Sequence, residues 1–266
     1  MSFYKSFLKL KFIAGLQYRF AAIAGICTQF FFGFIYIMVY NAFYENGGYN
    51  GISIESLISY IWLNQAFFSI VNLYYKDKEI INTIKNGNIS YELTRPKNVF
   101  FMWYAKILGT RLSNVVTRFL PIILVSLILP KNYRLGMPSS LESFILFIIT
   151  FILGIILVNL ITTFYHVIMM KTLDERGVVG IFITIGDILS GLVVPLPLFP
   201  KFLQKVANLF PFRYIGDLPF RIYSGNISVT DGLKSILIQI LWIIVIAILG
   251  YMLSKKILKK VVVNGG

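Results

Sequence analysis

The chain has 266 residues, 57% of them hydrophobic and 16% aromatic, and it carries a formal net charge of +14 at pH 7. This hydrophobic fraction is far above that of a soluble domain, so the composition predicts an integral membrane protein and leaves no stretch long enough for a separate soluble domain. The excess of basic residues is expected to reflect membrane topology and attraction to anionic lipid headgroups, because nucleic-acid binding would need an exposed basic domain.

Residues 1–19 place apolar side chains at helical spacing. Phe3, Phe7 and Leu10 share one face, and lysines lie between them. This pattern is typical of a helix that lies in the cytoplasmic membrane interface. The alternative is a plain extension of the first spanning helix. The apolar run that follows is too long for a signal peptide and lacks a small-residue cleavage site, so we expect it to be retained.

A helix needs roughly 20 apolar residues to cross the hydrocarbon core of a bilayer. The following stretches are long and apolar enough: 20–43, 54–75, 103–129, 142–170, 178–198 and 234–254. We therefore predict an all-α membrane protein in which residues 1–266 form a single transmembrane domain with six spanning helices.

Basic residues predict the orientation, because Lys and Arg are enriched at the cytoplasmic ends of spanning helices. One set of helix ends carries most of them: Lys5, Lys9, Lys11, Arg19, Lys76, Lys78, Lys85, Arg95, Lys97, Lys171, Arg176, Lys255, Lys256, Lys259 and Lys260. The opposite ends carry fewer: Lys131, Arg134, Lys201, Lys205, Arg213 and Arg221. The sequence thus predicts a multi-pass protein of the cell membrane with both termini in the cytoplasm.

The longest predicted cytoplasmic connection covers residues 76–98. Its first half has Ile80, Ile81 and Ile84 on one side and ends at an Asn-Gly pair, which commonly terminates helices. Its second half ends at an Arg-Pro pair, which forces an extended exit. A two-turn helix with this apolar stripe could fill a groove on a partner protein. The alternative is that the stripe packs only on its own bundle, and periodicity alone favours neither.

Several charged residues lie within the predicted spans. Asp187 is the one acid placed near the middle of a span, and it is a functional candidate because burial of a carboxylate there is costly. Arg111 and Arg118 share a face of the third helix. We expect Asp187 to form an ion pair with one of these arginines; the alternatives are a substrate or gating role, or capping of freed amides. Lys106 is expected to extend to the headgroups.

The stretch after Asp187 contains repeated helix breakers. Proline removes a backbone donor and disfavours helix in the preceding residue. The breakers are Pro195, Pro197, Pro200 and Pro211. Backbone groups freed at membrane depth must be buried in protein or face a water-filled cavity. We therefore predict an outer re-entrant, amphipathic segment at 199–232, which is more typical of transport machinery than of a plain anchor.

Catalytic chemistry finds little support in the sequence. The chain has no G-x-x-x-x-G-K-[ST] loop for nucleotide phosphates, and it contains a single His and a single Cys. Clustered metal sites and Cys/His couples are therefore excluded. We expect no enzyme activity and no bound cofactor. His166 is expected to be packed or bonded to a carbonyl group, and Cys27 to lie in the core.

Four motifs occur in order along the chain. They are GNISYELTRP in the inner loop, SGLVVPLPLFP in the fifth helix, LFPFRY with LPFRIYSG after it, and VVVNGG at the carboxyl end. Together they resemble the membrane-spanning permease subunits of type-2 ATP-binding-cassette (ABC) exporters, with the greatest similarity to the small six-helix permeases. The resemblance covers nearly the whole chain and agrees with the orientation predicted from charge.

This resemblance implies a permease that exports a substrate by alternating access, driven by ATP hydrolysis on a separate subunit that holds ATP and Mg. The implied partners are ABC ATPase subunits, a second permease that is the same chain or a paralogue, and membrane lipids. It also implies a coupling helix in the first inner loop. The candidate ATPase-coupling residues are Ile80, Ile81, Ile84, Tyr91, Glu92, Arg95 and Pro96.

Two other functions are weighed against this one. A secondary transporter or channel subunit that works without ATP would need several intramembrane acids or an inverted repeat, and the sequence offers one such acid and no clear repeat. A membrane enzyme would need a catalytic constellation, which the sequence lacks. A neighbouring reading frame that encodes an ABC ATPase would distinguish ATP-driven from ATP-independent transport.

Overall fold

The computed structural model describes residues 2–46, 51–89, 92 and 98–259. Every regular element in these residues is helical, which confirms the all-α class. The elements are α1 (Ser2–Leu16), α2 (Arg19–Glu45), α3 (Ile54–Val71), α4 (Lys78–Lys85), α6 (Val99–Asn114), η1 (Val115–Phe119), α7 (Leu120–Ile128), α8 (Leu141–Thr172), α9 (Glu175–Ser190), η2 (Leu196–Leu198), α10 (Lys201–Asn208), η3 (Pro211–Tyr214), α11 (Asp217–Tyr223) and α12 (Val229–Leu258).

Polar side chains determine where several of these helices begin. The first amides of a helix have no intrahelical partner, and an oxygen atom at the preceding residue accepts a hydrogen bond from them. The residues that make such bonds are Ser53 before α3, Asp77 before α4, Asn98 before α6, Ser140 before α8, Asp174 before α9 and Ser228 before α12. The starts of these helices therefore follow from the local sequence.

Among the described residues, five helical stretches are long and apolar enough to cross a membrane. They are Arg19–Glu45, Ile54–Val71, Val99–Ile128, Leu141–Thr172 and Val229–Leu258. The third of them joins α6 to α7 through the single π-helical turn η1. These stretches correspond to five of the six predicted spans. The remaining predicted span, 178–198, is not one continuous helix.

The helix in that region, α9, ends at Ser190, well before residue 198. Gly191 has a left-handed backbone with φ of +74°, and a Cβ atom there would collide with the hydroxyl of Tyr60. Glycine tolerates both conditions, so it stops the helix before the first proline. The prolines lie beyond this end: Pro195 precedes η2, Pro197 lies within it, Pro200 precedes α10 and Pro211 begins η3.

The amino-terminal helix is separate from the first span. α1 ends at Leu16, and α2 begins at Arg19 after a break in the helix. α1 instead packs along α6, where a Cβ atom on Gly109 would lie 2.5 Å from the carbonyl oxygen of Leu8. The alternative of a plain extension of the first span is therefore wrong, while the location of α1 in the membrane interface stays a prediction.

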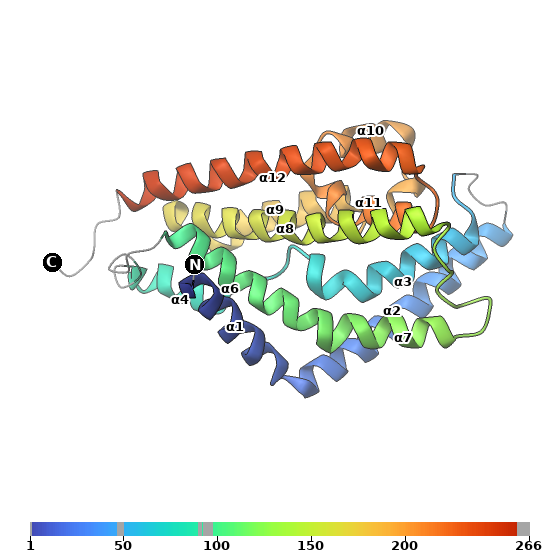
Figure 1. The fold of residues 1–266 in the computed structure, drawn as a ribbon, viewed down its shortest axis with the longest axis horizontal. Coiled ribbons are helices and arrows are strands. Elements are labelled where there is room, and N and C mark those ends of the chain that lie inside the picture. Colours follow the sequence, from blue (N-terminus) through green and yellow to red (C-terminus); the bar gives the residue numbers. More distant parts are fainter. Residues whose placement is uncertain (1, 47–50, 90–91, 93–97, 260–266) are drawn as a thin grey trace.

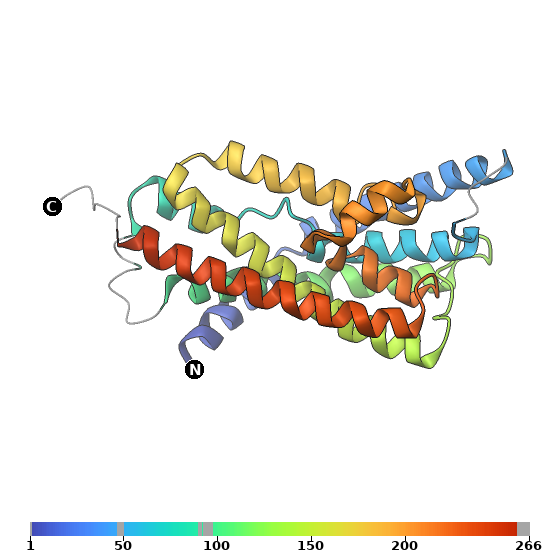
Figure 2. The ribbon, with the colours of Figure 1, turned by 90° about the horizontal axis from the view of Figure 1, so that it is seen from above.

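The long helices run roughly along one axis of the molecule (Figures 1 and 2). α4, the start of α1, the turn between α8 and α9 and the end of α12 lie toward one end, whereas α10 and α11 lie toward the other. The segments predicted to be cytoplasmic from their basic residues therefore gather at a common end. Below, we call this end the α4 end.

The core lies between α3, α8 and the short helices that follow α9. Phe67 of α3 stacks on Phe119 with ring centroids 4.3 Å apart and on Phe220 of α11 at 5.8 Å. α3 does not continue to the predicted residue 75. It ends at Val71, and a non-helical linker crosses toward α4 (Figures 1 and 2).

Candidate functional site around α4

The predicted short helix in the inner loop is present as α4. The carboxylate of Asp77 caps it by accepting hydrogen bonds from the amides of Glu79 and Ile80, at 3.0 and 3.1 Å. The helix ends before Asn86, and Gly87 follows with a left-handed φ of +69°. The predicted helix and its Asn-Gly stop are therefore confirmed.

The apolar stripe of α4 faces inward. Ile80, Ile81 and Ile84 are all buried in the main core cluster, and α4 packs against α8. In this structure the chain itself covers the stripe, as the self-packing alternative has it. Contact of these isoleucines with an ATPase stays a prediction. The face of α4 that remains outside is polar, with Lys78, Asn82 and Lys85 exposed.

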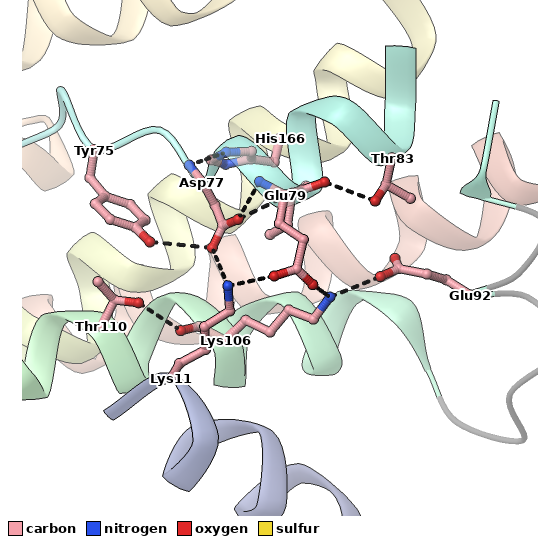
Figure 3. A network of polar contacts seen from close by, with 10 residues as sticks. Lys11, Tyr75, Asp77, Glu79, Thr83, Glu92, Lys106, Thr110 and His166 are labelled. Carbon is pink, nitrogen blue, oxygen red and sulfur yellow. Dashed lines mark hydrogen bonds and ion pairs between the residues drawn. The ribbon is translucent and has the colours of Figure 1, made fainter. Parts of the chain in front are cut away.

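A network of ion pairs fastens α4 to α1 and α6 (Figure 3). The ammonium group of Lys11 donates to one oxygen of Glu79 at 2.6 Å, and that of Lys106 donates to the other oxygen at 2.9 Å. Lys106 also binds Glu92 at 3.0 Å. One carboxylate on α4 thus joins a lysine from α1 to a lysine from α6. Because several charges share partners, this network has more structural weight than an isolated surface pair.

The sequence predicts that Lys106 extends to the headgroups, but in the structure its side chain points into the protein. It is only 2% exposed and lies 5.4 Å from the ring centre of Phe7. A buried ammonium needs charged partners, and two glutamates provide them. Glu92 is in turn held by the indole N–H of Trp103 at 2.5 Å. Of the remaining predicted coupling residues, Tyr91, Arg95 and Pro96 lie outside the described residues.

The pKa of Glu79 shows how strongly the lysines bind it. Burial raises the pKa of this carboxyl, but hydrogen bonds from Lys11 and Lys106 outweigh that effect and lower it from 4.5 to about 2. A carboxyl with a lowered pKa stabilises the folded state above its unfolded pKa, and this stabilisation is lost as the pH falls through the folded value. The carboxylate of Glu79 is therefore charged at neutral pH.

We accordingly expect α4 to remain fastened down to about pH 4.5 and to loosen as the pH falls toward 2, the interval over which Glu79 binds its proton. A fluorophore attached to a cysteine at Asn82, in a Cys27→Ser background, measures this loosening as a change in emission during an acid titration. Glu79→Gln removes the titrating group, so its emission at neutral pH should already resemble that of the acidified parent. An identical acid transition in both proteins would show that Glu79 does not fasten α4.

The linker between α3 and α4 receives its hydrogen bonds from neighbouring helices. The guanidinium of Arg111 donates to the carbonyl oxygens of Ile70 and Asn72, the latter at 3.1 Å. The hydroxyl of Tyr165 on α8 donates to the carbonyl oxygens of Leu73, at 3.4 Å, and Tyr75. Backbone that is not helical within a membrane bundle is tolerated only when protein groups satisfy it, and here α6 and α8 supply those groups.

The predicted ion pair of Asp187 with an arginine is not formed. Asp187 instead accepts a hydrogen bond from the hydroxyl of Tyr74 in the linker. Arg111 binds carbonyl oxygens and the hydroxyl of Thr162 at 2.7 Å, and Arg118 binds the carbonyl oxygen of Ala21 at 3.2 Å. Helical periodicity placed the arginines on one face, but it could not show that broken backbone would compete for their guanidinium groups.

His166 and Cys27 have different outcomes. Nδ1 of His166 lies 2.7 Å from the carbonyl oxygen of Thr162, and Nε2 accepts from the amide of Asp77 at 3.4 Å. The predicted packed, carbonyl-bonded histidine is confirmed, and it also contacts the start of α4. Cys27, expected in the core, is exposed on the side of α2. Among the described residues, no group of three or more His, Cys, Asp or Glu side chains could hold a metal ion.

A second polar cluster holds the short helices that follow α9. Asp217 is fully buried, and its carboxylate accepts from the hydroxyl of Tyr60 at 3.1 Å and from Nε of Arg213 at 3.2 Å. Arg221 lies 3.6 Å from the same carboxylate. The hydroxyl of Tyr60 also contacts the carbonyl oxygen of Gly191. α3 is thereby bound both to the end of α9 and to α11.

Comparison with known families is consistent with this architecture. A family model described as "ABC-2 family transporter protein" matches residues 25–264. The match includes every described span except the start of α2, together with α4, α9 and the short helices after it. A comparison with curated proteins finds no match.

Proposed function

Because the chain belongs to the ABC-2 transporter family, as the match over most of its length shows, we propose that it is the permease subunit of an ABC exporter whose ATP is hydrolysed on a separate ATPase subunit. In this proposal the chain lies in the cell membrane, the α4 end faces the cytoplasm, and α4 is the coupling helix. The chain itself is not an enzyme and binds no cofactor; ATP and Mg are held by the ATPase.

The observation that carries the proposal is the way α4 is built. It is a short capped helix at the end of the molecule where the basic residues gather, and its inner face is fixed to the bundle by buried isoleucines and by the lysine–glutamate network. A helix fixed in this way can transfer a push from outside to the bundle, because the helix does not yield locally. The docking surface is then the polar outer face, not the apolar stripe.

The remaining elements are assigned within the same proposal. α9 and the residues that follow it up to 198 form the fifth, interrupted crossing, and residues 199–232 re-enter the membrane from the outer side. Prolines at the starts of η2, α10 and η3, and the buried Asp217 cluster, support a fixed, non-continuous crossing. A second permease, as the same chain or a paralogue, and surrounding lipids complete the transporter.

A substitution on the outer face of α4 tests this assignment. Asn82 is exposed, so Asn82→Trp should leave the permease folded while a bulky ring blocks docking. We expect the variant to reach the membrane in the amount of the parent but to lose a co-expressed ABC ATPase on purification, together with vanadate-sensitive ATP hydrolysis. Thr230→Trp, exposed at the start of α12, is the matched control and should retain both. Equal retention by both variants would place the ATPase elsewhere.

A further inference from the structure

Residues 72–77 form a non-helical linker between α3 and α4. It leaves α3 in the middle of the molecule and reaches α4, where Asp77 becomes the cap of that helix (Figures 1 and 3). Its carbonyl oxygens are bound by Arg111 from α6 and by Tyr165 from α8. The amide of Asp77 is bound by His166, also from α8.

Arg111 is an unusual residue for this position. Its side chain is 0% exposed, and in the described part of the chain its hydrogen bonds go to two carbonyl oxygens and one hydroxyl, with no carboxylate among them. A buried cation without an anion is costly, so a neutral residue would be favoured if only packing mattered. A guanidinium offers five donors in a planar fork. It can therefore bind the carbonyl of Ile70, in the last turn of α3, and the carbonyl of Asn72, the first in the linker, together.

The linker also contacts α9. The hydroxyl of Tyr74 donates to the carboxylate of Asp187, and Leu73 packs where a side chain on Gly186 would otherwise lie. Tyr74 of the linker is therefore bound to α9, and Asp77 at the end of the linker caps α4. α9 is bound a second time at its own end, because Asn64 of α3 donates to the carbonyl oxygen of Leu192 at 2.7 Å.

We propose that residues 72–77 form a transmission segment that carries movement of α4 to α9, with Arg111 and Tyr165 as the positioning residues that hold it extended. Arg111 and Tyr165 bind backbone carbonyl oxygens of the segment from two flanking helices, so the segment is held against buckling when α4 is displaced. Its hydrogen bonds go to side chains of flanking helices, so it moves by exchanging discrete partners, as a two-state element must. The proposal rests on the function proposed above, in which α4 receives the ATPase.

Two single-fluorophore proteins test the proposal in the complete complex of permease and ATPase. In a Cys27→Ser background, a bimane group is attached to a cysteine at Asn82 on α4 or at Ile188 on α9, both exposed. ATP with vanadate is added, and the emission change is recorded. With Arg111 intact, both labels should respond. In Arg111→Gln, the Asn82 label should still respond, and the response of the Ile188 label should be lost.

Arg118→Gln is the matched control, because Arg118 lies in the same spanning stretch but binds α2 instead of the linker. Both labels should respond in that variant. If Arg111→Gln does not fold, Tyr74→Phe is tested in its place. The ring of Tyr74 is half-exposed, and this substitution removes only the hydroxyl that binds Asp187. The expected result is again a lost response at Ile188.

The outcomes separate this proposal from the one on which it rests. A full Ile188 response in Arg111→Gln or in Tyr74→Phe would overturn the transmission segment. A parent protein in which only the Asn82 label responds would also overturn it, while leaving α4 as the coupling helix. A parent in which neither label responds would overturn the coupling role of α4, and the transmission segment with it.

Discussion

Asp217→Asn is expected to lower the free energy of unfolding of the detergent-solubilised protein by about 3 to 5 kcal/mol, the usual cost of removing one partner from a buried ion pair. The carboxylate is fully buried and neutralises Arg213 and Arg221 while it accepts from Tyr60. An amide of the same shape leaves both guanidinium groups without an anion. Denaturant titration followed by tryptophan fluorescence measures the loss.

The matched control is Asp231→Asn. Asp231 lies 3.6 Å from Lys234 at the start of α12, with both side chains largely exposed. Exposed pairs contribute about 0 to 1 kcal/mol, so this variant should unfold close to the parent. Equal unfolding midpoints for the two variants would mean that the Asp217 cluster does not hold the short helices after α9.

The end of α3 and the linker that follows it could not be predicted from the sequence. Residues 54–75 are mainly apolar, and Asn72 alone is a weak local signal for an end at Val71. The helix ends there because Arg111 and Tyr165, which are distant in sequence, bind the freed carbonyl oxygens. Helical periodicity carries no information about such long-range partners. The same partners account for the wrong prediction that an arginine pairs with Asp187.

Local signals gave better predictions. The Asn-Gly stop of α4 and the prolines at or just before the starts of η2, α10 and η3 act on the backbone within one or two residues, so they could be recognised directly. Glu79 and Lys11 were missed because their roles depend on α1, α4 and α6 meeting in space. A lysine in the predicted interface helix and a glutamate in a predicted loop gave no reason to pair them.

The isoleucine stripe of α4 allowed two interpretations, since an amphipathic pattern shows which face is apolar but not what covers it. Its burial against α8 makes the pattern part of the core. If a substitution of one of these isoleucines abolished ATPase binding, the cause would then be unfolding of α4 and not the loss of a contact with a groove on the partner. The two interpretations predict different results for a mild substitution that adds no charge.

Ile80→Ala is therefore expected to destabilise α4 by about 2 to 5 kcal/mol, the range for truncating a buried Ile or Leu, because Ile80 is 0% exposed. Protease cleavage in residues 76–98 should become faster, and the ATPase should be lost in proportion to the cleavable fraction. Asn82→Ala, exposed on the same helix, should change cleavage little. If Ile80→Ala loses the ATPase while cleavage stays at the parent rate, the stripe contacts the partner directly and α4 must turn its apolar face outward in the complex.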